Sequence, residues 1–561
     1  MPLNRRGFCT SLAASAVSVR SRAATRDRAL KSSDIVNGPT NIHAFTENET
    51  LELKRDRTSW SAQDILVSTE AGANQTSLRV SVSSPRQRLL RLRLQWQGSL
   101  PNTERVSGDA WERSYGDLGW HPLEPDRILP WYFLAGSRDS YTGLGVQTGA
   151  GALCFWQTTP SEIVLWLDVR NGGRGVELGN RTLTAATIVL EDYARHSAFD
   201  AARKLCRRMA QSGVFMPAPI YGGNNWYYAY GHSSAEDIRA DTGRIASWAP
   251  PGPNRPFMVI DDGWSPYPTT GPWSEGNARF PDMARLASDI LGMGVRPGLW
   301  FRPLTTRAAV SETLLLKSKF AESRYARGQL RTLDPTVEGA AEQITTDVKR
   351  LCGWGFRLIK HDYSTYDLLG RWGFQMGSEI TDAQWSFADR TRTTAEIIRA
   401  FYQTLREAAG ATALLGCNTI GHLSAGLFEV QRTGDDTSGR DWSRTRKMGV
   451  NTLAFRSPQQ GTFFDVDADC VGLTNDIPWS LNRRWLDLLA RSGTALFVSA
   501  APDAVKQEQR DALRQAFSHA AVRQPVCEPL DWFETNQPER WRVGSKVSDF
   551  DWYSEDISLP I

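Results

Sequence analysis

The stretch Phe356–Asp362 reads Phe-Arg-Leu-Ile-Lys-His-Asp and predicts a short buried strand that ends in a carboxylate. Phe257–Asp261, Phe-Met-Val-Ile-Asp, is a second segment of this kind, and helical stretches separate such segments along the chain. Strands that alternate with helices favour a parallel sheet closed into a (β/α)8 TIM barrel. Eight strands are predicted, at Ile220–Trp226, Phe257–Asp261, Val295–Arg302, Phe356–Asp362, Ala413–Asn418, Phe428–Asp435, Thr462–Val466 and Ala495–Ser499. The fifth and sixth are too close together for an ordinary crossover helix, so that unit is expected to be irregular.

The chain before the barrel has a different pattern, in which apolar and polar residues alternate over short segments. Ser77–Val82, Leu89–Leu94 and Glu162–Leu167 are examples, and turn residues separate them. A period of two is typical of strands with one buried face, which favours a β-sandwich. A helix predicted at Phe199–Ser212 leads into the barrel. The expected fold class is therefore multidomain, with an N-terminal β-sandwich at 35–205, a central (β/α)8 TIM barrel at 206–502 and a short C-terminal helix and β segment at 503–561.

The amino-acid composition and net charge exclude several classes of protein. The chain has 561 residues, of which 41% are hydrophobic and 23% charged, and this excludes a disordered chain and an integral membrane bundle. The four basic residues of positions 1–23 account for the net charge of +3, and the remainder is close to neutral. A near-neutral chain without basic blocks argues against nucleic acid as a partner. The 21 Trp and 14 Tyr suit sugars, because aromatic rings stack on their apolar faces.

The first 23 residues predict an export signal. Arg5-Arg6-Gly7-Phe8 precedes a weakly apolar stretch, and Ser21-Arg22-Ala23 resembles a small-x-small cleavage site. The twin arginine favours the Tat route to a periplasmic or secreted location, and a short basic arm is the alternative. The six later cysteines form no CxxC pair and no cluster with His, so we expect free buried thiols.

Acidic residues follow several of the predicted barrel strands. Asp261 and Asp262 close the second strand, Asp362 the fourth, and Asp435 and Asp436 the sixth. In a (β/α)8 barrel the carboxyl ends of the strands meet at one face, where reactive groups gather. Two carboxylates from different strands are what acid-assisted glycoside cleavage requires. Each carboxylate alone is equally consistent with a helix cap or an ion pair.

The motifs at these strand ends resemble those of a known family. They occur in the order Asp261-Asp262-Gly263-Trp264, Gly298-Leu299-Trp300-Phe301, Lys360-x-Asp362, Gly416-Cys417, Arg432-x-Gly434-x-Asp436-Thr437 and Asp467-x-Asp469-Cys470. The sequence resembles melibiase-type α-galactosidases of glycoside hydrolase family 36, in clan D with family 27. The resemblance covers roughly residues 215–500 and extends loosely over the rest.

The resemblance implies roles for individual residues. Asp362 would be the nucleophile and Asp436 the general acid/base. Lys360 would hold the nucleophile ionised and donate to a sugar hydroxyl, and Asp261 and Asp262 would accept bonds from the 4- and 6-hydroxyls. The other substrate-binding residues are expected to be Arg432, near the 2-hydroxyl, with Trp300, Cys417, Asn418 and Trp226.

Three departures from the family pattern leave alternatives open. Asp435 stands where the family usually has proline, and alternation along the strand predicts that only one of Asp435 and Asp436 faces the substrate. Arg302 replaces a family glutamate and would either admit an acidic substrate or pair with a nearby acid. Cys417-Asn418 replaces the family's Cys-Gly, so recognition at the sugar's C2 position is not transferred.

The leading hypothesis is a retaining exo-α-glycosidase, most simply an α-galactosidase acting on a galactoside or oligosaccharide without a metal or other cofactor. Alternatives within the class are an α-galactosyl transglycosylase, an α-N-acetylgalactosaminidase and a glycosidase of anionic sugars. The alternative from another class is a non-catalytic carbohydrate-binding protein. The sequence leaves an oligomer open. His361 has no partner at metal-ligand spacing and is expected to pack in the core.

Overall fold

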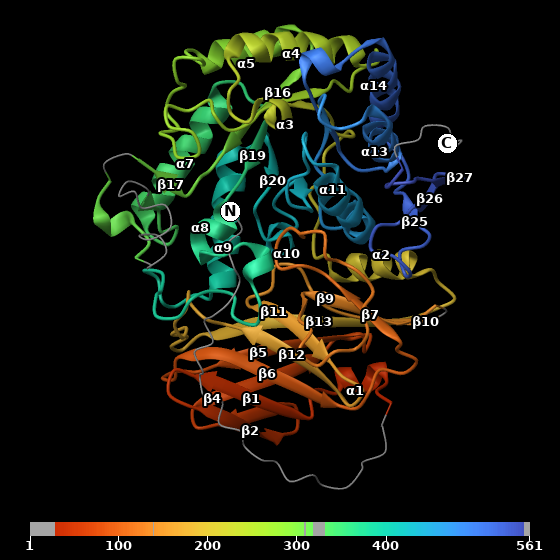
Figure 1. Cartoon of the computed structure of the whole chain (residues 1–561). Coiled ribbons are helices and arrows are strands. Elements are labelled where there is room, and N and C mark those ends of the chain that lie inside the picture. The colour runs from red at the N-terminus through yellow and green to blue at the C-terminus, as the bar shows by residue number, and fades with distance from the viewer. Residues whose placement is uncertain (1–28, 139, 308–309, 318–330, 555–561) are drawn as a thin grey trace, which may run out of the picture.

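The computed structural model describes residues 29–138, 140–307, 310–317 and 331–554 (Figure 1). The predicted export signal lies outside the described residues. In the part of the chain that is described, no helix combines the length and apolar character that a membrane crossing requires.

An antiparallel domain forms the N-terminal part, drawn in red to orange in Figure 1. Among the described residues its thirteen strands follow one another as hydrogen-bonded neighbours in the order β7-β9-β10-β13-β5-β4-β3-β2-β1-β6-β12-β11-β8. The predicted alternation is present in β5, where Leu78, Val80 and Val82 are buried and the side chains between them are not. The elements are α1 (Ser32–Val36), β1 (Asn41–Thr46), β2 (Thr50–Asp56), β3 (Ser59–Ala62), β4 (Ile65–Ala71), β5 (Ser77–Ser83), β6 (Leu89–Gln97), β7 (Arg105–Gly108), β8 (Leu129–Pro130), β9 (Tyr132–Ser137), β10 (Ser140–Val146), β11 (Leu153–Thr158), β12 (Glu162–Asp168) and β13 (Thr182–Ala194).

A parallel-sheet domain follows the helix α2 (Ala198–Met209), close to where a junction helix was predicted. The strand order in its described part is β22-β21-β20-β19-β16-β15-β14-β24-β23. The strands at the two edges of this sheet, β22 and β23, are separated in the chain only by Ala468 and Asp469. The sheet therefore curls until its two edges lie next to each other. The strands are β14 (Tyr221–Asn224), β15 (Phe257–Ile260), β16 (Arg296–Phe301), β19 (Leu358–His361), β20 (Ala413–Gly416), β21 (Val430–Arg432), β22 (Asp465–Asp467), β23 (Cys470–Leu473) and β24 (Leu496–Ala500).

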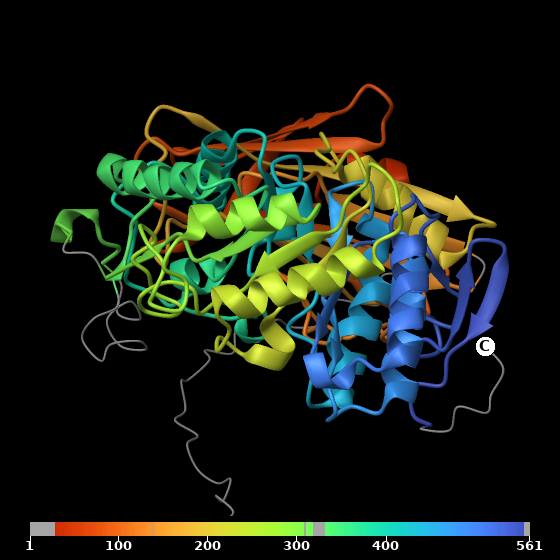
Figure 2. The same cartoon turned by 90° about the horizontal axis from the view of Figure 1, so that it is seen from above.

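Helices connect these strands and lie outside the curled sheet (Figures 1 and 2). The short α10 is the helix between β20 and β21, and this confirms the predicted irregular unit. The helices are α3 (Trp226–Ala229), α4 (Ala235–Trp248), α5 (Met283–Gly292), α7 (Glu338–Gly353), α8 (Ser364–Leu369), α9 (Thr394–Ala409), α10 (Gly421–Ser424), α11 (Trp442–Thr445), α12 (Thr452–Arg456) and α13 (Trp479–Arg491). The short strands β17 (Thr305–Thr306) and β18 (Arg331–Thr332) pair beside the sheet.

All eight strands predicted for this domain are present, seven of them shorter than predicted and the eighth, β24, shifted by one residue, whereas β23 was not predicted. The seventh needs a correction, because residues 462–464 form a turn and the strand begins only at Asp465. The hydroxyl of Thr462 donates to the carbonyl of Gln459 at 2.8 Å, and the N–H of Phe463 donates to the same carbonyl. These bonds close a turn, whereas the apolar residues of the segment had predicted a strand.

The C-terminal segment consists of α14 (Gln507–Ala520) and a small sheet of β25 (Glu528–Pro529), β26 (Arg540–Val543) and β27 (Lys546–Asp549). In both views it lies in blue along one side of the molecule (Figures 1 and 2). It packs on the antiparallel domain, where the ring of Trp120 contacts the rings of Trp532 and Phe533. The segment is therefore attached to the first domain as well as to the second.

A buried ion pair joins the antiparallel and parallel-sheet domains. Asp109 accepts hydrogen bonds from Arg456 Nε at 2.7 Å and from Gln459 Nε2 at 2.8 Å. Arg456 also donates to the carbonyl of Thr433 at 2.9 Å, just after β21. The side chains of Asp109 and Arg456 are only 4% and 3% exposed. This contact therefore fixes the segment after β7 against the carboxyl end of the sheet.

We expect Asp109→Ala to lower the free energy of unfolding by about 3 to 5 kcal/mol, because it leaves the Arg456 guanidinium buried without its counter-ion. Urea denaturation measures the change. The control is Glu70→Ala, whose pair with Arg79 is exposed at the surface. It should cost less than about 1 kcal/mol. Equal effects of the two substitutions would contradict a structural role for the buried pair.

Candidate active site

Asp362 lies directly after β19, at the carboxyl end of the parallel sheet. Its Oδ2 accepts a hydrogen bond from the indole Nε1 of Trp300 at 3.0 Å. Its Oδ1 accepts the backbone N–H groups of Tyr363 at 2.6 Å and Asn418 at 3.1 Å. These donors come from the ends of three neighbouring strands, β16, β19 and β20. The carboxylate is therefore held in one orientation by neutral N–H donors.

Lys360 pairs with Asp261, whereas the family resemblance implied support of Asp362. Its Nζ donates to Asp261 Oδ2 at 2.6 Å, and the same oxygen accepts from Asn224 Nδ2 at 2.7 Å. Burial disfavours the ammonium, but the charge of Asp261 outweighs it and raises the pKa of Lys360 well above the ordinary value. The charged Lys360 interacts electrostatically with both Asp362 and Asp436. The two carboxylates therefore belong to one site.

Asp262 is held by a neighbouring loop. Its carboxylate accepts the backbone N–H of Thr269 at 2.7 Å and the Thr269 hydroxyl at 2.6 Å. Burial raises the pKa of Asp262, against the effect of these hydrogen bonds. The bond from this carboxyl to a sugar hydroxyl stays a prediction.

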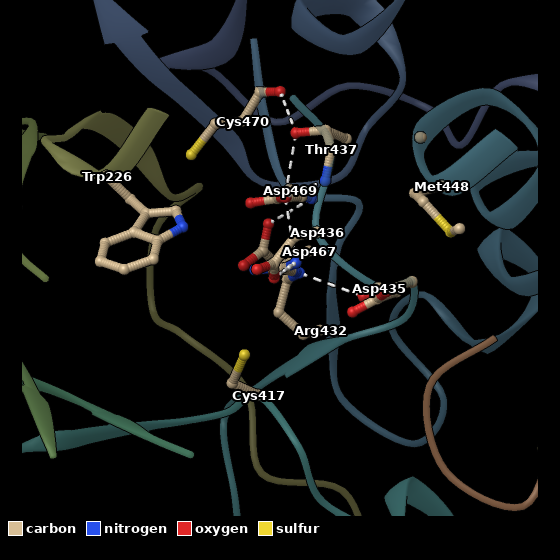
Figure 3. A network of polar contacts seen from close by, with 12 residues as sticks. Trp226, Cys417, Arg432, Asp435, Asp436, Thr437, Met448, Asp467, Asp469 and Cys470 are labelled. Atoms are coloured by element: carbon tan, nitrogen blue, oxygen red, sulfur yellow. Dashed lines mark hydrogen bonds and ion pairs between the residues drawn. The ribbon is translucent and has the colours of Figure 1, made fainter. Parts of the chain in front are cut away.

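Asp436 lies beyond β21, and its side chain is more exposed than those of Asp261, Asp435 and Asp469. Its side chain is 39% exposed, and its Oδ1 accepts from Arg432 Nη2 at 2.9 Å. The same guanidinium pairs with Asp469 at 3.0 Å and is 1% exposed (Figure 3). Arg432 therefore holds two carboxylates, and its contact with the sugar's 2-hydroxyl stays a prediction.

In Figure 3 Asp435 lies at the edge of this cluster, with its carboxylate directed toward it. It pairs with Arg113 at 2.9 Å and with Arg444 at 2.7 Å. The strand β21 ends before it, at Arg432, but the chain stays extended because Ser114 of the antiparallel domain bridges Gly434. The N–H of Ser114 donates to Thr433 O at 2.8 Å, and the N–H of Asp435 donates to Ser114 O at 2.9 Å. Because Asp435 and Asp436 both contact the guanidinium of Arg113, the expectation that only one of them faces the substrate stays a prediction.

Arg113 reaches the site from the antiparallel domain. Its guanidinium contacts Asp435, lies 3.6 Å from Asp436 Oδ1 and lies 3.8 Å from Cys417 Sγ. Enclosure by protein raises the pKa of Asp436, but Arg432, Arg113 and Lys360 outweigh it and lower the pKa to about 2. In the free protein Asp436 is therefore a carboxylate at neutral pH.

Glu112, the residue before Arg113, is fully buried beneath the same site. It accepts hydrogen bonds from the side-chain amide of Asn418, from the Tyr115 hydroxyl and, at 2.8 Å, from the N–H of Gly373. Burial raises the pKa of Glu112 to about 7. Asn418 Oδ1 accepts the N–H of Tyr366 at 3.1 Å, so both ends of this amide are engaged inside the protein.

Glu112 and Arg113 were not predicted as site residues from the sequence. A signal was present, because the chain between β7 and β8 is far longer than the tight turns elsewhere in the antiparallel domain. Long connections in compact domains are commonly functional. What the sequence did not show is that this connection crosses to another domain.

The remaining predicted residues lie around the same cluster. Trp300 and Cys417 are buried, and Trp226 is half-buried with its ring against Tyr230. In Figure 3 Trp226 lies across the acidic cluster from Asp435. The predicted contact of Trp226 with a sugar stays a prediction, with core packing as the alternative.

The alternative of an acidic substrate for Arg302 is wrong. Arg302 is 0% exposed and forms a two-point ion pair with Asp367, through Nε at 2.9 Å and Nη2 at 2.5 Å. The guanidinium also lies over the ring of Tyr363. The negative charge that balances Arg302 comes from Asp367 of α8, which is 65 residues away in the chain.

His361 packs as predicted, with its ring against Phe401, Tyr402 and Phe428. Burial lowers the pKa of His361 to about 3, so the ring is neutral. Over the described ranges, no group of His, Cys, Asp and Glu side chains is arranged to hold a metal ion.

Glu112 gives a testable pH dependence. Its pKa of about 7 in the folded protein lies above the ordinary 4.5, so ionisation between these values costs folded-state stability. The free energy of unfolding should therefore fall as pH rises from 4.5 to 7, and Glu112→Gln should remove about 3 kcal/mol of that fall. Urea denaturation over this range tests it, with the exposed Glu52→Gln as control. Parallel pH curves for wild type and Glu112→Gln would contradict the prediction.

Comparisons with known proteins give no match to a family model and no match among curated proteins. Solved structures do match. An α-galactosidase from Thermus thermophilus, in complex with p-nitrophenyl α-D-galactopyranoside, has a TM-score of 0.60 at 18% identity and covers 91% of this chain and 99% of its own. The family 36 α-galactosidase AgaA from Geobacillus stearothermophilus has a TM-score of 0.56 at 13% identity, with coverage of 89% and 78%.

An α-galactosidase from Lactobacillus brevis has a TM-score of 0.54 at 13% identity and covers 85% of this chain and 72% of its own. The Thermus protein has also been solved with stachyose, and a variant of AgaA with raffinose. Similarity at this level of identity establishes the fold. The chain has the multidomain fold of the melibiase-type α-galactosidases of glycoside hydrolase family 36.

Proposed function

We propose that this protein is a retaining exo-α-galactosidase that cleaves terminal α-D-galactosides through a covalent glycosyl-enzyme. The observation that carries the proposal is the unequal setting of two carboxylates at one end of the parallel sheet. Asp362 is oriented by N–H donors, whereas Asp436 is partly exposed beside two guanidinium groups. Retaining cleavage needs one carboxylate fixed for attack and a second that exchanges a proton. Fold similarity to α-galactosidases supports the same proposal.

Asp362 is proposed as the nucleophile. An Oδ atom attacks the anomeric carbon, the glycosidic bond breaks, and the leaving oxygen takes a proton from Asp436. Asp436 then removes a proton from water, which attacks the anomeric carbon and releases Asp362. The two inversions retain the configuration. Trp300 and the N–H of Asn418 keep the attacking carboxylate in place during both steps.

Asp436 must regain a proton before it acts as an acid. Its exposed carboxyl is held ionised by Arg432 and Arg113 in the free site. A bound sugar displaces water from that carboxyl, which disfavours its charge and raises its pKa. Asp435 is a weaker choice for this role, because Arg113 and Arg444 pair with both of its oxygens.

The proposed domain folds and the proposed location of the protein follow the resemblance to glycoside hydrolase family 36. The curled parallel sheet would be a complete (β/α)8 catalytic barrel and the antiparallel domain a β-sandwich. The chain would act after export to the periplasm or medium. An α-galactosyl transglycosylase would use the same residues and exclude water from the second step. Product analysis with an added sugar acceptor separates that alternative from hydrolysis.

Substitution of the two carboxylates tests their roles. We expect Asp362→Ala to lower turnover of nitrophenyl α-galactoside by several orders of magnitude, with azide giving the inverted galactosyl azide. Asp436→Ala should still form the glycosyl-enzyme from this substrate, because nitrophenolate leaves without protonation, and azide should give the retained product. Product configuration is read by NMR.

The matched control is Asp435→Asn, next to the proposed acid/base, which should lower turnover far less than Asp436→Ala. A nitrophenyl α-glucoside should be a poor substrate for the wild type. If the wild type binds galactose but turns over no α-glycoside, the non-catalytic carbohydrate-binding hypothesis replaces this one.

The proposed role of Asp436 also gives a pH prediction. Removing the Arg113 charge should raise the pKa of Asp436, so its acid form persists to higher pH. We expect Arg113→Gln to shift the alkaline limb of the kcat/KM profile to higher pH. Arg444→Gln is the control, since Arg444 pairs with Asp435 at 2.7 Å. An unmoved limb in Arg113→Gln, or an equal shift in Arg444→Gln, would count against this assignment.

A further inference from the structure

A series of aromatic rings runs from the residue next to Asp362 toward the surface. The ring of Tyr363 lies 5.5 Å from that of Trp372, and the Trp372 ring stacks on Tyr366 at 4.5 Å. From the antiparallel domain, the ring of Tyr115 lies 4.8 Å from that of Phe374. The rings belong to the segment after β19 and to the connection between β7 and β8, so two domains build the series.

Arg113 places these rings beside the catalytic carboxylates. Its guanidinium carbon lies 5.4 Å from the centre of the Trp372 ring and 5.8 Å from that of Tyr115. The same guanidinium pairs with Asp435 and lies 3.6 Å from Asp436 Oδ1. Trp372 and Tyr115 therefore lie against the guanidinium that also reaches Asp436.

The segments that carry the rings are tightly held together. A Cβ atom on Gly373 would lie 2.6 Å from Glu112 Cγ and 3.0 Å from the Tyr115 ring, so only glycine permits this approach. The N–H of Gly373 and the hydroxyl of Tyr115 both donate to Glu112. The rings are thus fixed in advance of any ligand, which lowers the entropy cost of binding.

Phe374 ends the series and is 62% exposed. Phe374 lies in a short turn, η2 (Gly373–Gln375), where its ring contacts Tyr115 but is otherwise open to solvent. Flat apolar rings are suited to the apolar faces of sugars.

We propose that Trp372, Phe374 and Tyr115 form a binding platform for the second sugar ring of the substrate, on the leaving-group side of Asp436. The inference rests on the proposed function, because a general acid lies next to the glycosidic oxygen and the departing sugar extends beyond it. The ligand class is an oligosaccharide that carries a terminal α-galactoside. A galactoside with a small leaving group would not reach the platform.

The test compares two substrates of the full chain. Raffinose places a sugar on the leaving-group side, whereas α-galactosyl fluoride places only fluoride there. We expect Phe374→Ala to lower kcat/KM for raffinose by roughly three- to tenfold and to leave that for the fluoride unchanged. Phe374→Tyr should keep the wild-type kcat/KM for raffinose, because it keeps a flat ring. Phe374→Leu should lower this kcat/KM nearly as much as Phe374→Ala.

Phe215→Ala is the matched control. Phe215 is 38% exposed and precedes β14, at the opposite end of the sheet, so neither substrate should be affected. Equal losses of raffinose and fluoride turnover in Phe374→Ala, or no loss for raffinose, would overturn the platform.

A binding experiment separates the platform from the proposed function. In Asp362→Ala, calorimetry should show tighter binding of raffinose than of galactose, and adding Phe374→Ala should abolish the difference. This readout needs no turnover. If the wild type is inactive but the difference is present and depends on Phe374, the proposed function fails while the platform holds. Equal affinities for raffinose and galactose in Asp362→Ala would overturn the platform.

Discussion

The buried contact of Arg113 with Asp435 and Asp436 is the interaction on which the arrangement of the site depends. A guanidinium taken out of water is tolerated only where acids and hydrogen-bond acceptors surround it, so this contact fixes the connection between β7 and β8 against the end of β21. Ser114 then pairs with the extended chain at Gly434, and Glu112 receives the amide of Asn418. The antiparallel domain thereby becomes one wall of the site.

Charge balance in this region keeps the buried cations charged and holds Asp436 ionised. Lys360, Arg432 and Arg113 are each paired with at least one carboxylate, so each cation stays charged although it is buried. Asp362 is held by N–H groups and Asp436 by cations, and this difference separates two residues of the same chemical type. Unequal surroundings are how two carboxylates take different roles in one reaction. The half-open position of Asp436 leaves it accessible for proton exchange.

Departures from the family pattern have local structural causes. Arg302 stands where the family has glutamate, and Asp367 of α8 supplies its counter-charge within hydrogen-bond distance. Asn418 lies where the family has glycine, and its amide is directed into Glu112 and the N–H of Tyr366. In both cases the polar side chain that departs from the family pattern has its hydrogen-bond partners inside the protein. Neither points to a change in the charge of the substrate.

The sequence by itself determined the period of each domain, the eight parallel strands and the acids that follow them, because strand alternation and strand-end position are local properties of the chain. The fold comparisons confirm the resemblance that these motifs carried. Which side chains meet was decided only by tertiary structure. The pairing of Lys360 with Asp261, the burial of Arg432 and the entry of Glu112 and Arg113 all join residues far apart in the chain. No local pattern encodes such contacts, since they arise when the strands of one sheet assemble or when two separately patterned domains pack together.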